Sequence, residues 1–132
     1  MILIDSNVPM YLVGAEHPNK DGARRMVERS IAAKERLVTD AEVFQEILHR
    51  YVAIGRHEAA EDAFDVLIGL VFDVLPIELV DVQRARSLVF GPGNLSARDA
   101  IHVAVMQRRG IDRVMTFDAA FDRVPGIRRV SE

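Results

Sequence analysis

The sequence predicts a three-layer α/β/α domain, in which a mainly parallel sheet of four or five strands lies between helices. Short apolar segments alternate with longer segments whose apolar residues recur at helical spacing, and this alternation is typical of parallel sheets. The length of 132 residues suits a single domain, residues 1–132. Hydrophobic residues make up 49% of the chain, which permits a core of useful size.

The chain begins with a predicted strand over residues 2–4. These residues are large or β-branched, as in a strand that is buried in a parallel sheet. A short helix over 8–13 is expected next, with Ser6 or Asn7 as its N-cap and Pro9 in its first turn.

The next three elements are a helix, a strand and a helix. Residues 21–33 are rich in Ala, Arg and Glu, which favour a helix, and the apolar stretch behind them predicts a strand over 36–39. Apolar residues at helical spacing predict a helix over 40–54. Thr39 and Glu42 fit a capping box at its start, in which Glu42 reaches back to the Thr39 amide.

The middle of the chain repeats this alternation. Helical spacing of apolar residues predicts a helix over 57–72, and the short apolar segment 73–77 predicts a strand or an extended piece. A helix over 80–89 follows. Glycine and proline at 91–94 predict a loop, and a helix over 97–109 comes after it.

The chain ends with a strand over 113–117, a helical turn over 119–121 and a last strand over 127–130. Strands that are separated by helices are connected by right-handed crossovers. The strands are therefore expected to run parallel.

The composition excludes several classes of protein. The chain has no cysteine, which excludes disulfides and zinc–thiolate sites and fits the cytoplasmic location that we expect. Asp5 interrupts the N-terminal apolar segment, unlike a secretory signal, and the longest apolar run, 66–72, is far below the roughly 20 residues that span a bilayer. The net charge of −3 is not that of a protein that coats nucleic acid.

Four acidic residues that lie far apart in the sequence form the candidate site. Asp5 and Asp118 each follow a predicted strand directly, and open α/β sheets bind ligands at the carboxyl ends of their strands. Asp99 lies in the first turn of a predicted helix, although Ser96 and Asp99 also fit a capping box. Glu46 lies within a predicted helix, beside its apolar face.

Two further acidic residues complete the list of candidates. Glu42 and Glu46 are four residues apart and share one helix face, so either could reach the site. The capping box gives Glu42 a structural role and favours Glu46. Asp122 follows Asp118 by four residues and is a candidate supporting residue or ligand of a second metal ion.

An oxygen-rich pocket of this kind suits a hard divalent cation. Carboxylates within a few ångström raise one another's pKa values, and a bound cation relieves that repulsion. One ion would take one or two carboxylates directly, whereas two ions would clamp both oxygens of a phosphodiester displacement. His102, one turn after Asp99, is better explained as a helix-face or supporting residue than as a ligand.

The segments Ile2–Asn7, Leu95–Ala104 and Met115–Asp118, together with Glu46, resemble the PIN-domain family. Within that family the chain most resembles the VapC toxins of bacterial toxin–antitoxin pairs, over nearly its whole length. The resemblance implies a PIN-like fold and a Mg²⁺- or Mn²⁺-dependent endoribonuclease that cuts structured RNA such as tRNA or rRNA. It also implies a homodimer and a cognate antitoxin that blocks the site.

The resemblance assigns roles to individual residues. It implies an acidic quartet that is both catalytic and metal-binding, made of Asp5, Glu46, Asp99 and Asp118. It implies Asn7 and Thr116 as polar support near the metal. Threonine or serine often stands at the position of Asn7 in the family, and asparagine is a polar variant of them.

Three other interpretations compete with a nuclease. A haloacid-dehalogenase-type phosphatase needs an acid/base aspartate where this chain has Asn7, which cannot transfer that proton. A phosphoacceptor receiver domain needs a late lysine, and no lysine follows Lys34. A non-catalytic interaction or signalling module of α/β fold, whose carboxylates only cap helices, stays open at this point.

Overall fold

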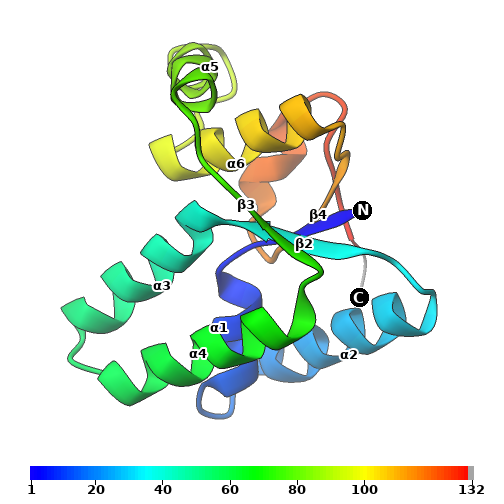
Figure 1. The fold of residues 1–132 in the computed structure, drawn as a ribbon, viewed down its shortest axis with the longest axis vertical. Helices are drawn as coiled ribbons and strands as arrows, with labels where there is room; N and C mark the ends of the chain where they lie inside the picture. Colours follow the sequence, from blue (N-terminus) through cyan, green and yellow to red (C-terminus); the bar gives the residue numbers. More distant parts are fainter. Residues whose placement is uncertain (131–132) are drawn as a thin grey trace.

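The structure is a computed structural model that describes residues 1–130, and these residues form a five-stranded sheet, six α-helices and one 3₁₀ helix (Figure 1). The strands are β1 (Ile2–Ile4), β2 (Leu37–Asp40), β3 (Asp73–Leu75), β4 (Arg113–Met115) and β5 (Arg128–Arg129). The helices are α1 (Asn7–Val13), α2 (Pro18–Ala32), α3 (Ala41–Ala53), α4 (His57–Leu70), α5 (Leu79–Val89), α6 (Ala97–Arg109) and the 3₁₀ helix η1 (Ala119–Arg123).

The sheet is parallel throughout and has the strand order β3-β2-β1-β4-β5. The central strand β1 pairs Ile2 with Leu37 of β2 on one side and with Arg113 of β4 on the other. The chain first adds strands outward beyond β2 and then returns to the opposite side of β1. The strand order therefore reverses between β1 and β4, where open α/β sheets bind their ligands.

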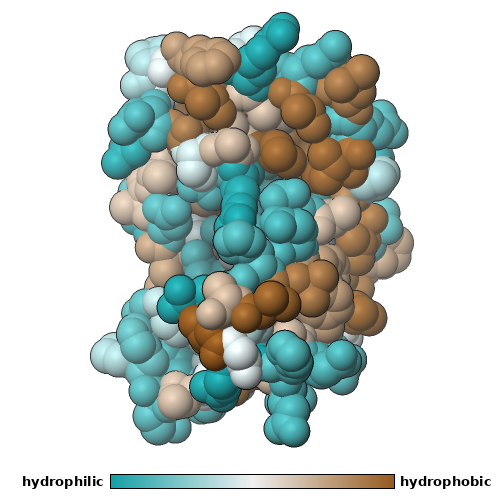
Figure 2. Space-filling view, turned by 90° about the vertical axis from the view of Figure 1, so that its left-hand side faces the viewer, coloured by the Kyte–Doolittle hydropathy of each residue, from teal (hydrophilic) through white to brown (hydrophobic). Residues whose placement is uncertain are grey.

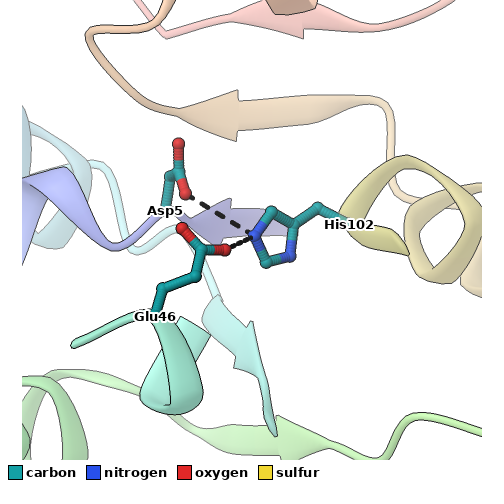
Figure 3. Close-up of side chains that lie close together, drawn as sticks. All are labelled: Asp5, Glu46 and His102. Carbon is teal, nitrogen blue, oxygen red and sulfur yellow. Dashed lines mark hydrogen bonds and ion pairs between the residues drawn. The ribbon is translucent and has the colours of Figure 1, made fainter. Parts of the chain in front are cut away.

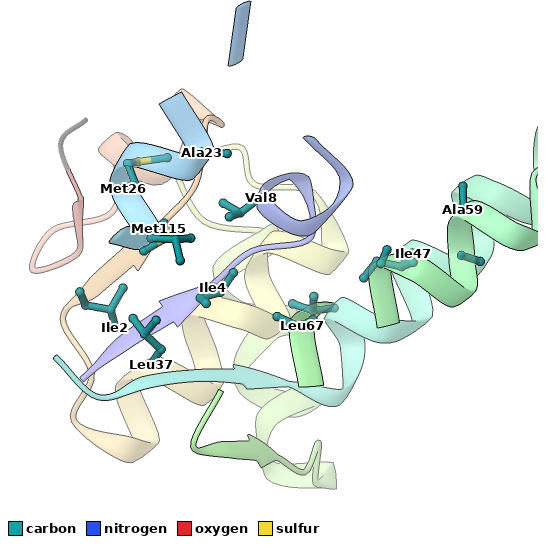
Figure 4. Packing of buried hydrophobic residues seen from close by; sticks show 14 of the residues in the cluster. Ile2, Ile4, Val8, Ala23, Met26, Leu37, Ile47, Ala59, Leu67 and Met115 are labelled. Atoms are coloured by element: carbon teal, nitrogen blue, oxygen red, sulfur yellow. The ribbon is translucent and has the colours of Figure 1, made fainter. Parts of the chain in front are cut away.

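The two faces of β1 belong to two hydrophobic cores. Ile2 and Ile4 pack against α1 to α4, whereas Leu3 packs in the core formed with α5 and α6. This alternation is the two-residue period of a strand that is buried on both faces. Figure 1 shows the two helical layers on opposite sides of the sheet, and Figure 4 shows the core that Ile2 and Ile4 form with α1 to α4. The predicted α/β fold with a parallel sheet between helices is confirmed.

Helix α2 begins at Pro18, earlier than the predicted start at residue 21. Proline suits the first helical position because its fixed backbone angle matches the helix and its missing amide hydrogen is not needed there. His17 acts as the N-cap, and its Nδ1 accepts a hydrogen bond from the amide of Asn19 at 3.0 Å. A histidine cap has no strong sequence signature, which explains the error in the prediction.

The predicted capping box of Thr39 and Glu42 is wrong. Helix α3 is capped one residue later by Asp40, whose Oδ1 accepts a hydrogen bond from the amide of Val43 at 3.0 Å. The hydroxyl of Thr39 donates instead to the carbonyl of Ile4 at 2.8 Å. This bond ties the end of β2 to the end of β1, so Thr39 belongs to the strand and the cap falls to the next residue.

An ion pair between a buried aspartate and a solvent-accessible arginine joins α5 to α6. The Arg108 guanidinium donates from Nε and Nη2 to the two carboxylate oxygens of Asp81, at 2.7 and 2.9 Å. Asp81 is only 1% exposed. Hydrogen bonding to Arg108 lowers the pKa of Asp81 against the opposing effect of burial. The pair fixes the helix that carries Asp99 against its neighbour.

Replacing Asp81 with Asn should lower the free energy of unfolding by on the order of 1 kcal/mol at pH 7, because the Arg108 guanidinium loses its charge-assisted hydrogen bonds while solvent screens its charge. The folded pKa of Asp81 is depressed. Its contribution is therefore present above the ordinary carboxyl pKa of about 4 and is lost as the pH falls through the folded value. Urea unfolding followed by circular dichroism at pH 7 and at pH 3 measures this difference.

Asp112→Asn is the matched control, since Asp112 lies 3.9 Å from Arg128 in an exposed ion pair. The free energy of unfolding of the Asp112→Asn protein at pH 7 should fall by less than about 0.5 kcal/mol. Equal losses for the two variants would contradict a structural role of the Asp81–Arg108 pair.

Candidate functional site

Asp5 follows β1 at the point where the strand order reverses, and it is 3% exposed. Its Oδ2 accepts hydrogen bonds from the Thr116 hydroxyl at 2.7 Å and from Asn7 Nδ2 at 3.3 Å. Its Oδ1 accepts one from the amide of Ser6 at 2.8 Å. Burial raises the pKa of Asp5, and the neighbouring His102 opposes that rise. These donors from the ends of β1 and β4 hold the carboxylate in one orientation.

Ser6 is the N-cap residue of α1, one of the two predicted alternatives, but its side chain makes no capping hydrogen bond and, like that of Asn7, serves the site. The Ser6 hydroxyl donates to Glu46 Oε2 at 2.9 Å. The Asn7 side chain donates to the Thr116 hydroxyl at 3.0 Å and accepts from the amide of Phe117 at 3.2 Å. The polar pair after β1 therefore links Asp5 to α3 on one side and to the segment after β4 on the other.

Glu46 reaches this cluster from α3. Both of its carboxylate oxygens are engaged, Oε2 with the Ser6 hydroxyl and Oε1 with His102 Nε2. Glu42 lies one turn earlier on α3, where burial and the charge of Glu46 raise its pKa. The contacts of Glu46 with Ser6 and His102 favour it over Glu42 as the site residue.

His102 of α6 lies at the centre of the cluster and is completely buried. Its Nδ1 is 2.7 Å from Asp40 Oδ2, while its Nε2 contacts Glu46 Oε1 and lies 3.8 Å from Asp5 Oδ1. Figure 3 shows Asp5, Glu46 and His102 converging from three different elements. Burial alone would lower the pKa of the imidazole. The carboxylates of Asp40 and Glu46 outweigh that effect and raise the pKa of His102 well above its ordinary value.

Sequence reasoning misses two members of this cluster, Asp40 and Ser6, and gives too little weight to His102. Asp40 ends β2 much as Asp5 follows β1, so the rule for strand ends is the signal that points to it. His102 lies one helical turn beyond Asp99 on the same side of α6. Ser6 has no such signal, because a serine next to a helix start is usually a cap.

Asp99 and Asp118 extend the acidic cluster. Ser96 caps α6 as predicted, by accepting a hydrogen bond from the amide of Asp99 at 3.2 Å. Burial, together with the charges of Asp5 and Asp118, raises the pKa of Asp99 to about 7. The Asp118 amide donates to the Thr116 hydroxyl at 3.0 Å. The structure thus brings the four predicted acidic residues into electrostatic contact.

Asp122 forms its hydrogen bonds outside this cluster. Its two carboxylate oxygens accept hydrogen bonds from Nε and Nη2 of Arg129, at 2.9 and 2.8 Å. These bonds lower the pKa of Asp122. The hydrogen bonds of Asp122 thus pair it with β5, and none of them joins it to the acidic quartet.

The chemistry of the donor set fits a divalent cation. One carboxylate oxygen each from Asp5 and Glu46 lies within 4.8 Å of the other and of a ring nitrogen of His102, and Asp99 adds a carboxyl whose ionisation is suppressed by burial and by its negative neighbours. A cation among these oxygens would relieve the repulsion. Figure 2 views the side of the molecule toward which the strands point, and hydrophilic residues gather across the middle of this face.

The fold and the site together define a class: an α/β domain with carboxylates gathered at the switch point of a parallel sheet. Residues 2–127 match the family model of the PIN domain. Ribonuclease VapC13 of Mycobacterium tuberculosis is 58% identical over 131 residues, which cover 99% of this chain and 100% of VapC13. The chain therefore belongs to the PIN-domain family, in its VapC branch.

Solved structures share the fold. VapC20 of Mycobacterium tuberculosis, a toxin that cleaves the sarcin–ricin loop, superposes with a TM-score of 0.74 at 23% identity and covers 90% of this chain and 91% of its own. A chain of a toxin–antitoxin complex from Klebsiella pneumoniae gives a TM-score of 0.65 at 17% identity and covers 97% and 96%. Within the part of the chain that the structure describes, no helix has the length and apolar character needed to cross a membrane.

Replacing Asp99 with Asn should raise the stability of the metal-free protein at pH 8. A carboxyl whose pKa is higher in the folded state than in the unfolded state destabilises the fold once it ionises. The folded pKa is about 7. The penalty is therefore absent below the unfolded pKa of about 4 and complete above the folded one.

Thermal unfolding in the presence of EDTA tests this expectation. The midpoint of the Asp99→Asn variant should exceed that of the parent by about a few degrees at pH 8 and should equal it at pH 4. Asp112→Asn, at an exposed residue just before β4, serves as the control and should show no such pH-dependent gain. An Asp99→Asn protein less stable than the parent at pH 8 would contradict the repulsion.

Proposed function

We propose that this protein is a metal-dependent endoribonuclease, a toxin that hydrolyses RNA phosphodiester bonds and is neutralised by a cognate antitoxin. The observation that carries the proposal is the meeting of acidic side chains from α3, α6 and the segments after β1 and β4 at one end of the sheet. The 58% identity to VapC13, a ribonuclease by name, supports the reaction class.

Asp5, Glu46, Asp99 and Asp118 are the residues that we propose to hold Mg²⁺ or Mn²⁺. Such an ion supplies, when bound, positive charge that polarises the scissile phosphate and lowers the pKa of water. Thr116 and Asn7 contribute by holding the Asp5 carboxylate in one orientation. A preoriented carboxylate loses little conformational freedom when it acts, which is the general advantage of a preorganised site.

We infer that the substrate is a structured RNA, such as a tRNA or an rRNA, recognised by its shape. The net charge of −3 gives the chain little non-specific attraction for phosphate backbones. Single-stranded loops present base edges that a protein can read, so a loop is the expected place of cleavage. The shared fold of VapC20, which cleaves the sarcin–ricin loop, supports this substrate class.

We also infer the partners and the setting of the protein. The acidic cluster suits a basic side chain inserted by an antitoxin, and the fold shared with a chain of a toxin–antitoxin complex supports such a partner. Exposed apolar side chains on α5, among them Leu79 and Val80, support a homodimer because a second copy would cover them. We propose that residues 1–132 act as one domain in the cytoplasm.

Replacing Asp5 with Asn should reduce RNA cleavage on the order of 100-fold while leaving the fold intact, because the amide lacks the negative charge that holds the metal. Initial rates on total cellular RNA with MnCl₂, with and without EDTA, measure the effect. Circular dichroism checks the fold. Expression of the variant without the product of the neighbouring gene should no longer arrest growth.

Asp122→Asn is the matched control, since this aspartate lies close to Asp118 in sequence but is paired with Arg129. It should keep most of its cleavage activity. Cleavage by the parent that persists in EDTA, or full activity of Asp5→Asn, would exclude the proposed reaction.

A further inference from the structure

A buried chain of contacts leads from the end of β2 to the acidic cluster. It runs from Asp40 through the imidazole of His102 to the carboxylate of Glu46. Asp40 and His102 are both 0% exposed, whereas Asp99 and Asp118 lie nearer the surface. Neither Asp40 nor His102 belongs to the acidic quartet, so their burial at this place needs its own explanation.

Asp40 is the fixed end of this chain. Its Oδ1 caps α3 through the amide of Val43, and its Oδ2 lies 2.7 Å from His102 Nδ1. Both oxygens are therefore used, one for the start of the helix that carries Glu46 and one for the imidazole. The same side chain fixes the origin of α3 and the orientation of the His102 ring.

His102 is the link. A carboxylate oxygen can only accept a hydrogen bond, so the ring donates from Nδ1 to Asp40 and from Nε2 to Glu46 Oε1. The Ser6 hydroxyl holds the other oxygen of Glu46 at 2.9 Å. A glutamate has several rotatable bonds and loses side-chain entropy when it is ordered. Here that ordering is achieved by two donors from other elements.

We propose that Asp40 and His102 are a positioning pair that holds the Glu46 carboxylate in place for a divalent cation. The inference rests on the proposed metal-dependent function and adds two residues to it. Both act through Glu46 and are positioning residues. Hydrogen-bonded partners of metal ligands typically contribute 10- to 100-fold to metal affinity or activity, so the effect is measurable.

Two substitutions of His102 separate its two contacts. The side-chain amide nitrogen of Gln lies near the position of the imidazole Nε2, so His102→Gln keeps a donor for Glu46. The amide nitrogen of Asn lies near Nδ1, so His102→Asn keeps the bond to Asp40 and loses the one to Glu46. Asp40→Asn keeps the cap of α3, because asparagine is an equally good N-cap, but weakens the hold on the imidazole.

Binding of Mn²⁺ to each purified protein, measured from the electron paramagnetic resonance signal of free Mn²⁺, is the test. We expect affinity to fall about 10- to 100-fold in His102→Asn and about 10-fold in Asp40→Asn. His102→Gln should stay within about threefold of the parent, because the donor to Glu46 is restored. Val103→Ala, on the same helix and equally buried, controls for loss of packing and should bind like the parent.

Equal weakening in His102→Gln and His102→Asn would overturn the proposal, since the imidazole would then be needed for itself, for instance as a ligand. Unchanged affinity in both His102→Asn and Asp40→Asn would also overturn it, and these two variants cover each other if one fails to fold. RNA cleavage at saturating Mn²⁺ tests the proposed nuclease activity separately from the positioning pair. A parent that binds Mn²⁺ but cleaves no RNA would refute the nuclease and leave the positioning pair standing.

Discussion

Repulsion among carboxylates crowded at the carboxyl end of β1 is the constraint on which the rest of the site depends. Burial, together with the charges of Asp5 and Asp118, brings the pKa of Asp99 to about 7. Such an arrangement destabilises a folded protein unless donors or cations compensate it. Much of the polar structure nearby, from the Ser6 hydroxyl to Thr116, supplies donors to these acids.

The packing of the elements that carry the acids offsets the destabilisation that the crowded carboxylates cause. The strand β1 is buried on both faces, and its hydrogen bonds to β2 and β4 fix the position of the Asp5 backbone that follows it. The Thr39 hydroxyl joins the ends of β1 and β2 through the carbonyl of Ile4. The positions of the acidic residues are therefore set by strand pairing and core packing and not by contacts among the carboxylates. A site of this kind is suited to binding a cation without rearranging.

The sequence is sufficient to predict the part of the site that depends on topology. In a parallel sheet all carboxyl ends meet at one edge, so Asp5 and Asp118 can be placed together from their positions after strands alone. The cap of α6 by Ser96 is equally local and is confirmed. Fold class and strand direction follow from the same alternation of apolar segments.

The other contacts of the site depend on packing between segments that are distant in sequence, which local patterns do not encode. Asp40 and His102 are 62 positions apart, and their contact exists only because the fold brings His102 of α6 to the end of β2. The spacing of Asp122 suggests the site, yet Arg129 of β5 is the partner that the fold brings to it. The capping box at Thr39 fails for a related reason, since that hydroxyl is drawn to a neighbouring strand.

A crystal of the protein grown with MnCl₂ and measured at the manganese absorption edge tests the central claim most directly. We expect an anomalous peak between the carboxylates of Asp5 and Asp99, with Asp118 or Glu46 beside it. The peak should vanish in crystals of the Asp5→Asn protein. Full occupancy of manganese elsewhere on the surface, with none among these four acids, would contradict the account.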